Sequence, residues 1–223
     1  MYALITDGSI AKYLSGNRGI TIGGIQYPQN IFTLWTAAEK EAIGIYEVIQ
    51  NNAKKKDEAY YINTNQTFTY DADAGTVTAT FGDATAKAHA DVNETWSQDA
   101  IDAGRAPDGT SAGDAMNDSD GNQIVTEGLK TKKIRTVKAQ AAGILQDTDW
   151  YIVRKADAST AVPSAITTFR AAVRSKAAAM ETAITNASNT PAIETLYTYV
   201  NTADEGDPEV FERPLGEFPV LGS

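Results

Sequence analysis

The chain of 223 residues contains no cysteine and a single histidine, His89. The lack of cysteine excludes disulfides, thiolate catalysis and cysteine-ligated zinc, and leaves carboxylates as the candidate ligands of a metal ion. The sequence also lacks a glycine-rich phosphate loop, so the motifs of the usual nucleophile, base and cofactor sites are missing. We therefore expect a protein that is not an enzyme and that has no catalytic residue and no cofactor. The alternative is a hydrolase that uses two carboxylates, because folding can bring two acids together from anywhere in a chain.

Long apolar runs are also missing. No stretch approaches the roughly 18 residues that a membrane-spanning helix needs, and the opening MYALITDG has neither the basic nor the apolar region of a signal peptide. We therefore expect no membrane contact and a cytosolic location where the protein is made. The net charge of −10 argues against general nucleic-acid binding, which needs clustered Lys and Arg. A hydrophobic fraction of 42% is ordinary for a globular protein with a substantial core.

Charge is unevenly distributed along the chain. Residues 89–126 carry eight acidic residues against one basic residue, Arg105, whereas residues 127–190 carry ten basic and five acidic residues. These changes, with the residue patterns described below, predict an α+β protein in four parts. The parts are a β-rich N-terminal domain (1–88), an acidic loop-rich insertion or linker (89–127), a helical domain (128–202) and an extended proline-rich tail (203–223).

Turn and strand signals fill the N-terminal part. Asp7-Gly8 separates two short apolar runs and predicts an opening hairpin, because both residues tolerate positive φ. Thr36 and Glu39 have the spacing of a capping box and predict a short helix that ends near Gly44. A strand follows at residues 45–49, and two more flank a turn at residues 71–75. We expect a small antiparallel sheet of four to six strands with one helix.

The acidic insertion has little apolar content and reads as loop. Its run Asn117-Asp-Ser-Asp-Gly-Asn122 is rich in the side-chain oxygens that bind calcium, but the spacing of these residues does not match that of a calcium-binding loop. If Gly121 takes the glycine position of that pattern, Met116 falls on the first ligand position. We therefore favour a solvated acidic turn over a metal site.

Apolar residues recur at helical spacing from Gly128 onward. One helix ends near Gln146, a second opens at Pro163, and a third starts at Thr190-Pro191 and ends before Glu205. Their inward positions are Leu129, Ile134, Val137, Ala141, Ile144 and Leu145; Ile166, Phe169, Val173, Ala177, Met180 and Ile184; and Ile193, Leu196, Tyr197 and Val200. The first two helices predict a helical hairpin, although the second stripe also suits a seam between chains. The basic residues of the first helix form either a solvated face or a patch for a partner.

A corner joins the first two predicted helices. The run Asp147-Thr148-Asp149 changes the direction of the chain, and Trp150 follows at the point where an aromatic side chain can seal the joint. We expect Trp150 to be a core aromatic and Asp149 to be a cap or turn residue. Arg170 and Arg174, four residues apart on one helix, are expected to pair with Asp147, Asp149 or Asp157.

The tail contains Pro208, Pro214 and Pro219 among apolar residues, a density that forbids a helix and predicts an extended path. Phe211 and Phe218 are its aromatic members. They are expected to pack on their own domain, and the alternative is that the tail docks on another subunit.

Several short segments together resemble bacteriophage tail proteins of the tail fibre assembly type. They are MYALITDG, IQYPQNIFTLW, GIYEV, and ILQDTDWYIVR followed by VPSAITTFRAAVR, and they cover roughly residues 1–88 and 128–200. The resemblance maps a corner motif onto Leu145, Thr148, Asp149 and Trp150, and a following helix with arginines onto Arg170 and Arg174. It implies a small phage protein, chaperone-like, that helps fibres fold and trimerise in the host cytoplasm. The acidic insertion and the tail have no counterpart in that pattern.

Two functions follow from this resemblance as expectations. The first is an assembly factor for phage tail fibres; the alternative is a permanent structural subunit of the virion tail, baseplate or fibre. In both, the expected partners are fibre or other tail proteins, with self-association possible through the apolar stripe and the tail. The candidate contact residues are Leu145, Asp149, Trp150, Arg170, Arg174, Phe211 and Phe218.

Overall fold

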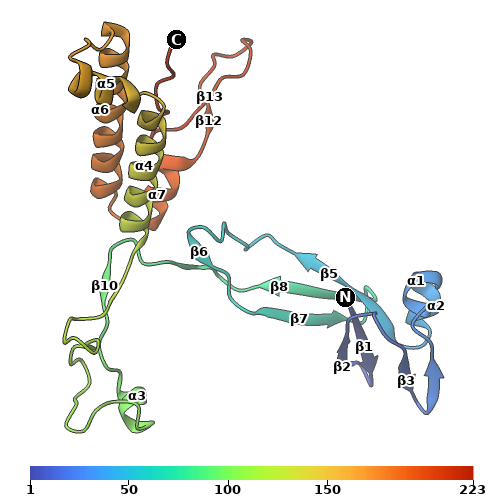
Figure 1. The fold of residues 1–223 in the computed structure, drawn as a ribbon. Helices are drawn as coiled ribbons and strands as arrows, with labels where there is room; N and C mark the ends of the chain where they lie inside the picture. The colour runs from blue at the N-terminus through green and yellow to red at the C-terminus, as the bar shows by residue number, and fades with distance from the viewer. Residues whose placement is uncertain (223) are drawn as a thin grey trace. The chain divides into compact units, whose positions relative to one another are not determined.

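Strands dominate the first part of the chain and helices the last, so the predicted α+β class is confirmed (Figure 1). The structure, a computed structural model, describes residues 1–222. It divides into two compact units, Met1–Thr85 and a second that begins at Ala86. The second unit contains the acidic insertion together with the helices and the tail.

The first unit contains a five-stranded sheet with the order β2-β1-β5-β8-β7. Its strands are β1 (Tyr2–Thr6), β2 (Ser9–Leu14), β5 (Ile45–Asn51), β7 (Gln66–Asp71) and β8 (Thr76–Phe81). Asp7 and Gly8, with φ of 50° and 73°, form the predicted turn between β1 and β2. The second predicted hairpin is also confirmed, because β7 and β8 pair antiparallel around a turn in which the Asp71 carboxylate accepts two backbone N–H groups.

The expectation of a purely antiparallel sheet is wrong at one place. β5 and β8 pair in parallel, with Val48 opposite Val77, so β8 rather than β7 lies beside β5. The physical reason is composition. β8 buries Val77 and Ala79 completely, whereas β7 carries Gln66 and Asp71 at its ends and suits an edge.

Each face of this sheet supports its own core. On one face Ala3, Val48, Val77 and Ala79 pack together. On the other, Leu14 and Ile45 pack against Ile31 and Phe32 of α1. The elements on this side are β3 (Ile20–Ile22), β4 (Ile25–Tyr27), α1 (Ile31–Leu34) and α2 (Ala37–Glu41). The Thr36–Glu39 capping box of α2 is confirmed, whereas α1 was not predicted.

The acidic insertion is a long loop of the second unit whose two ends are paired with each other. The short strands β10 (Val92–Asn93) and β11 (Val125–Thr126) pair antiparallel where the chain leaves and returns. Between them lies α3 (Gln98–Asp102). Two further short strands are β6 (Tyr61–Ile62) and β9 (Thr85–Ala86).

The insertion also caps the first long helix, α4 (Leu129–Gln146). The Asp91 carboxylate accepts the Gly128 N–H at 2.7 Å and the Thr131 hydroxyl at 2.9 Å. These donors hold the pKa of Asp91 below its usual range. The Leu129 N–H donates to the Ala88 carbonyl, so the free amides at the start of the helix have partners.

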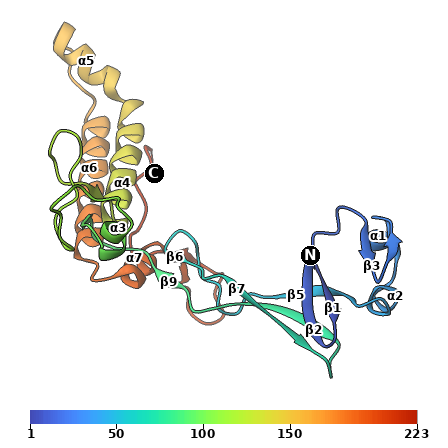
Figure 2. The ribbon, with the colours of Figure 1, turned by 90° about the horizontal axis from the view of Figure 1, so that it is seen from below.

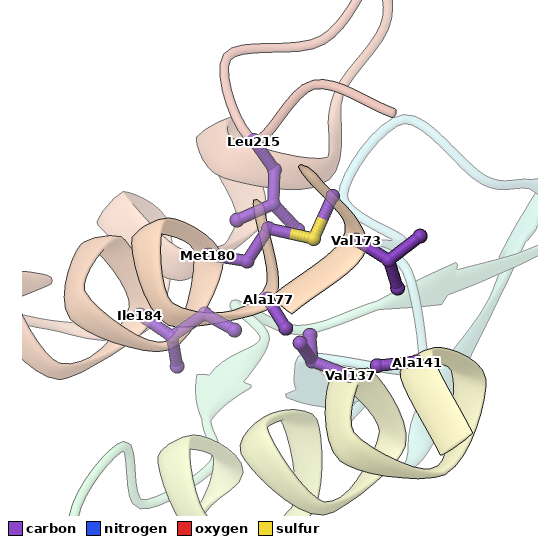
Figure 3. Close-up of a cluster of buried hydrophobic side chains, with 7 residues drawn as sticks. All are labelled: Val137, Ala141, Val173, Ala177, Met180, Ile184 and Leu215. Atoms are coloured by element: carbon purple, nitrogen blue, oxygen red, sulfur yellow. The ribbon is translucent and has the colours of Figure 1, made fainter. Parts of the chain in front are cut away.

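The helical core lies between α4 and α6 (Ser164–Asn186), which are side by side in both views (Figure 1, Figure 2). Figure 3 shows Val137 and Ala141 of α4 pointing toward the α6 residues, with Leu215 of the tail over Met180. The two predicted apolar stripes are therefore confirmed as the faces of a helical hairpin. α7 (Thr190–Tyr197) adds the buried Ile193. No helix in residues 1–222 is both long and apolar enough to cross a bilayer.

One expectation about the C-terminal part is wrong. α7 ends at Tyr197, and Val200 is exposed in a strand instead of facing inward. In residues 203–222 the chain forms no helix, as the prolines predict, and β13 (Phe211–Glu212) of the tail pairs with β12 (Val200–Asn201) in a hairpin. The aromatic and β-branched residues after Tyr197 favour a strand over further helix.

The close approach at the start of α4 provides a stability prediction. A Cβ added at Gly128 would lie 2.3 Å from both the carbonyl carbon and oxygen of Ala90, so Gly128→Ala must displace the base of the insertion. We expect this change to lower the free energy of unfolding by about 1–3 kcal/mol.

The matched control is Gly143→Ala in the same helix, where an added Cβ meets nothing within 4 Å. We expect it to raise stability by about 0.5–1 kcal/mol, because alanine favours a helix over glycine. Urea unfolding of both variants measures the difference, and equal effects would show that the contact with Ala90 is unimportant.

Candidate functional site

The corner after α4 is a hydrogen-bonded joint between three helices. α4 ends at Gln146, and a separate helix, α5 (Asp149–Ala158), starts three residues later. The hydroxyl of Thr148 is buried at the turn and donates to the Leu145 carbonyl at 2.9 Å. This bond gives a partner to one of the carbonyls that every helix leaves free at its C-terminus.

Arg170 of α6 holds the joint together. Its Nη1 donates to the Thr148 Oγ1 at 2.6 Å and to the Leu145 carbonyl at 2.9 Å, and it lies 2.8 Å from the Asp149 Oδ1. The guanidinium is buried, so these bonds also satisfy the charge that burial would otherwise leave unpaired. A cation at the C-terminus of α4 and an acid in the first turn of α5 both suit the helix dipoles.

The structure thus brings together three of the predicted residues, Leu145, Asp149 and Arg170, and selects Asp149 from the three candidate acids. Arg174 lies one turn further along α6 and is exposed, and within residues 1–222 it forms no ion pair. The corner is accordingly a structural joint, in which Arg170 bonds to groups of both α4 and α5.

The prediction that Trp150 is a core aromatic is wrong. Its side chain is 51% exposed, because Thr148 occupies the buried position of the corner and Trp150 already belongs to α5. The Trp150 ring instead stacks on Tyr151 with centroids 3.7 Å apart. The Arg154 guanidinium lies over both rings, 4.8 Å from the Trp150 centroid.

Helix α5 was not among the helices predicted from the sequence. Its apolar residues occur on several sides, so they form no stripe that periodicity could detect. One signal was available, since Asp149 in the first turn and Lys155 in the last suit a helix dipole.

A groove of about 360 Å³ adjoins the corner. Its lining residues are mostly apolar and come from α4, the corner, α6 and the end of the tail: Ile144, Asp147, Thr148, Phe169, Phe218, Pro219, Val220 and Leu221. Phe218 is therefore placed at the corner, partly buried against the helical core. Phe211 is not, because it lies in β13 and is 56% exposed.

A polar cluster fastens the tail to the end of α7. The Arg213 Nε lies 2.7 Å from the Glu217 carboxylate. The Arg213 guanidinium also lies 5.6 Å from the centroid of the Tyr197 ring and 5.5 Å from that of Tyr199. The Tyr199 hydroxyl donates to Glu217 at 2.5 Å. That bond and Arg213 hold the pKa of Glu217 below its usual range, and the same bond raises the pKa of Tyr199.

The acidic turn at Asp118 uses its carboxylate internally. Asp118 Oδ1 accepts the N–H groups of Asp120 and Asn122, each at 2.9 Å, and the bond from Asn122 is the main reason that the pKa of Asp118 is lowered. Across residues 1–222, no three His, Asp or Glu side chains come together in a way that could hold a metal ion.

Comparison of the chain with protein-family models, with curated proteins and with solved structures found no match.

The joint gives a paired mutational prediction. Arg170→Ala removes the guanidinium that donates hydrogen bonds to the Thr148 hydroxyl and the Leu145 carbonyl. We expect the change to lower the free energy of unfolding by about 2–3 kcal/mol. Arg174→Ala, on the same helix but exposed, should change it by less than about 0.5 kcal/mol. Denaturant unfolding of the two variants tests this, and equal losses would show that Arg170 does not hold the corner.

The tail cluster gives a pH prediction. Because the pKa of Glu217 is lower in the folded chain than in the unfolded chain, its ionised form stabilises the fold above the usual Glu pKa of about 4.3. This stabilisation is lost as the pH falls through the folded pKa. Glu217 is 58% exposed, so we expect a loss of no more than about 1 kcal/mol.

Amide hydrogen exchange of residues 198–217 between pH 7 and pH 3 measures this loss. Glu217→Gln should exchange faster than the parent chain at pH 7 and show a smaller change with pH. Exchange that depends on pH identically in both chains, after correction for intrinsic rates, would contradict the assignment.

Proposed function

We propose that this chain is a non-enzymatic bacteriophage tail protein that acts through protein–protein contacts during the assembly of fibres or tails. The observation that carries the proposal is α5, a helix whose residues Trp150, Ile152 and Val153 are all exposed. Apolar side chains gathered on an exposed element mark interaction surfaces. Tryptophan and arginine, the residues stacked here, are also the residues that dominate binding energy at interfaces.

The resemblance of the corner segment to tail fibre assembly proteins supports the same proposal. In the structure, Leu145, Thr148 and Asp149 of that segment belong to one bonded joint with Arg170. A joint of this kind holds α5 on the rigid α4–α6 pair, so the exposed side chains are presented to a partner with little loss of conformational entropy.

Under this proposal the chain works as an assembly factor in the host cytoplasm. The alternative is a permanent subunit of the virion, and two observations favour it. The acidic insertion forms a self-contained excursion closed by β10 and β11, and the β12–β13 hairpin exposes Val210 and Phe211. Both offer further surfaces for lasting contacts with other tail proteins.

Quantitative mass spectrometry of purified particles and of infected lysate tests the proposal and separates its two forms. A permanent subunit appears in particles at a fixed ratio to other tail proteins. An assembly factor is abundant in lysate, co-purifies with fibre chains and is missing from particles. A chain that is found neither in particles nor with any tail protein would refute both forms.

The enzyme alternative has a direct test as well. Purified protein is incubated with host surface glycans, and the products are separated by size. We expect no turnover, and cleavage that persists after repurification would overturn the non-enzymatic proposal.

A further inference from the structure

Helix α5 leaves its apolar side chains without a covering element of the same unit. None of its residues is buried, and Trp150, Ile152 and Val153 are 51%, 43% and 65% exposed. We call Trp150, Val153 and Arg154, which are three and four residues apart and therefore share one side of this helix, the aromatic face. A helix that exposes apolar residues on several sides is normally covered by another surface.

The groove beside the corner has the complementary character. Its lining, given above, is apolar except for the turn residues, and Asp147 is its single charged member. Asp147 has no ion pair within residues 1–222, and the contacts of Arg154 there are with the Trp150 and Tyr151 rings. Each surface therefore combines apolar side chains with one charge that lacks an opposite charge, and the two charges have opposite sign.

The two surfaces are also adjacent in the chain. Asp147 and Thr148 line the groove, and α5 begins at Asp149. A twofold axis beside the corner can therefore place the aromatic face of each chain on the groove of the other, in a closed pair with two identical contacts.

We propose that two copies of this protein form a symmetric dimer in which the aromatic face of each chain occupies the corner groove of the other and Arg154 pairs with the partner copy's Asp147. The proposal rests on the assembly role described above and deepens it, because a second copy and a tail protein then compete for the same aromatic face. Its test uses the purified chain alone, so failure of the dimer leaves the association with tail proteins to be judged by the particle experiment.

The expected strength follows from the size of the surfaces. One short helix and one groove per chain bury less area than a standard interface, so the dimer should dissociate on dilution. Tryptophan in the centre of a small interface supplies much of the binding energy. The main determinant of the dimer is therefore Trp150.

The first experiment is light scattering coupled to size exclusion, or sedimentation equilibrium, over a wide range of concentration. Wild-type protein should change from monomer to dimer as concentration rises. Trp150→Ala should weaken the dimer by at least about 30-fold, the loss expected for an interface tryptophan. Leu34→Ala, at a residue that is 74% exposed in the first unit, is the control and should leave the dimer unchanged.

Charge reversal tests the orientation of the contact. Asp147→Arg and Arg154→Asp each place like charges together and should each weaken the dimer. The double variant restores opposite charges across the interface and should recover most of the affinity. Circular dichroism checks that every variant keeps the helical content of the wild type.

Cysteine cross-linking tests which surfaces meet, and the absence of natural cysteine keeps the reaction specific. Chains with Val153→Cys are mixed with differently tagged chains that carry Val220→Cys. Oxidation should yield disulfide-linked dimers that contain both tags, in excess over a mixture of Val153→Cys with Leu34→Cys.

Three results would overturn the proposal. They are a wild-type chain that stays monomeric at millimolar concentration, a Trp150→Ala variant that dimerises as well as wild type, and mixed cross-links no more abundant than in the Leu34→Cys control. Failure of the double charge reversal to recover affinity, when each single reversal weakens it, would overturn the pairing of Arg154 with Asp147.

Discussion

The helical unit depends on one buried cation. The Arg170 guanidinium bonds to the last turn of α4, to the hydroxyl that makes the corner and to the first acid of α5. One side chain of α6 therefore fixes where α4 ends and in which direction α5 begins. Apolar packing alone would hold α4 against α6 but would not fix the angle between α4 and α5, because apolar contact has little directional preference.

The parts of the fold that the sequence predicts are those with a local cause. The Asp7-Gly8 turn, the Thr36–Glu39 capping box and the stripes of α4 and α6 each follow from a few neighbouring residues. The parallel pairing of β5 with β8 has no such cause. It depends on which of two similar strands better fills the middle of the sheet, a comparison that only tertiary packing makes.

The candidate site shows the same division. Arg170 and Arg174 look equivalent by spacing, yet α6 passes the corner at Arg170, so one arginine is buried and the other is solvated. Phe211 and Phe218 look equivalent in the tail, yet only Phe218 follows the buried Leu215 back onto the helices. Trp150 was misplaced because a large aromatic residue near a turn usually fills a core, whereas here the smaller Thr148 fits the joint.

The way the acidic insertion is closed has a consequence for how this chain can change over generations. Its two ends are tied by β10 and β11 and by the bonds from Asp91 to the start of α4, so the intervening residues carry none of the helical core. Lengthening such an excursion costs little, since the entropy of closing a loop grows only slowly with its length. Mutation and recombination can therefore change the sequence and length of this segment, and so the partners that it contacts, while the packed helices stay the same. The acidic insertion is thus a part of the protein that can be exchanged while the packed helices α4 and α6 are kept.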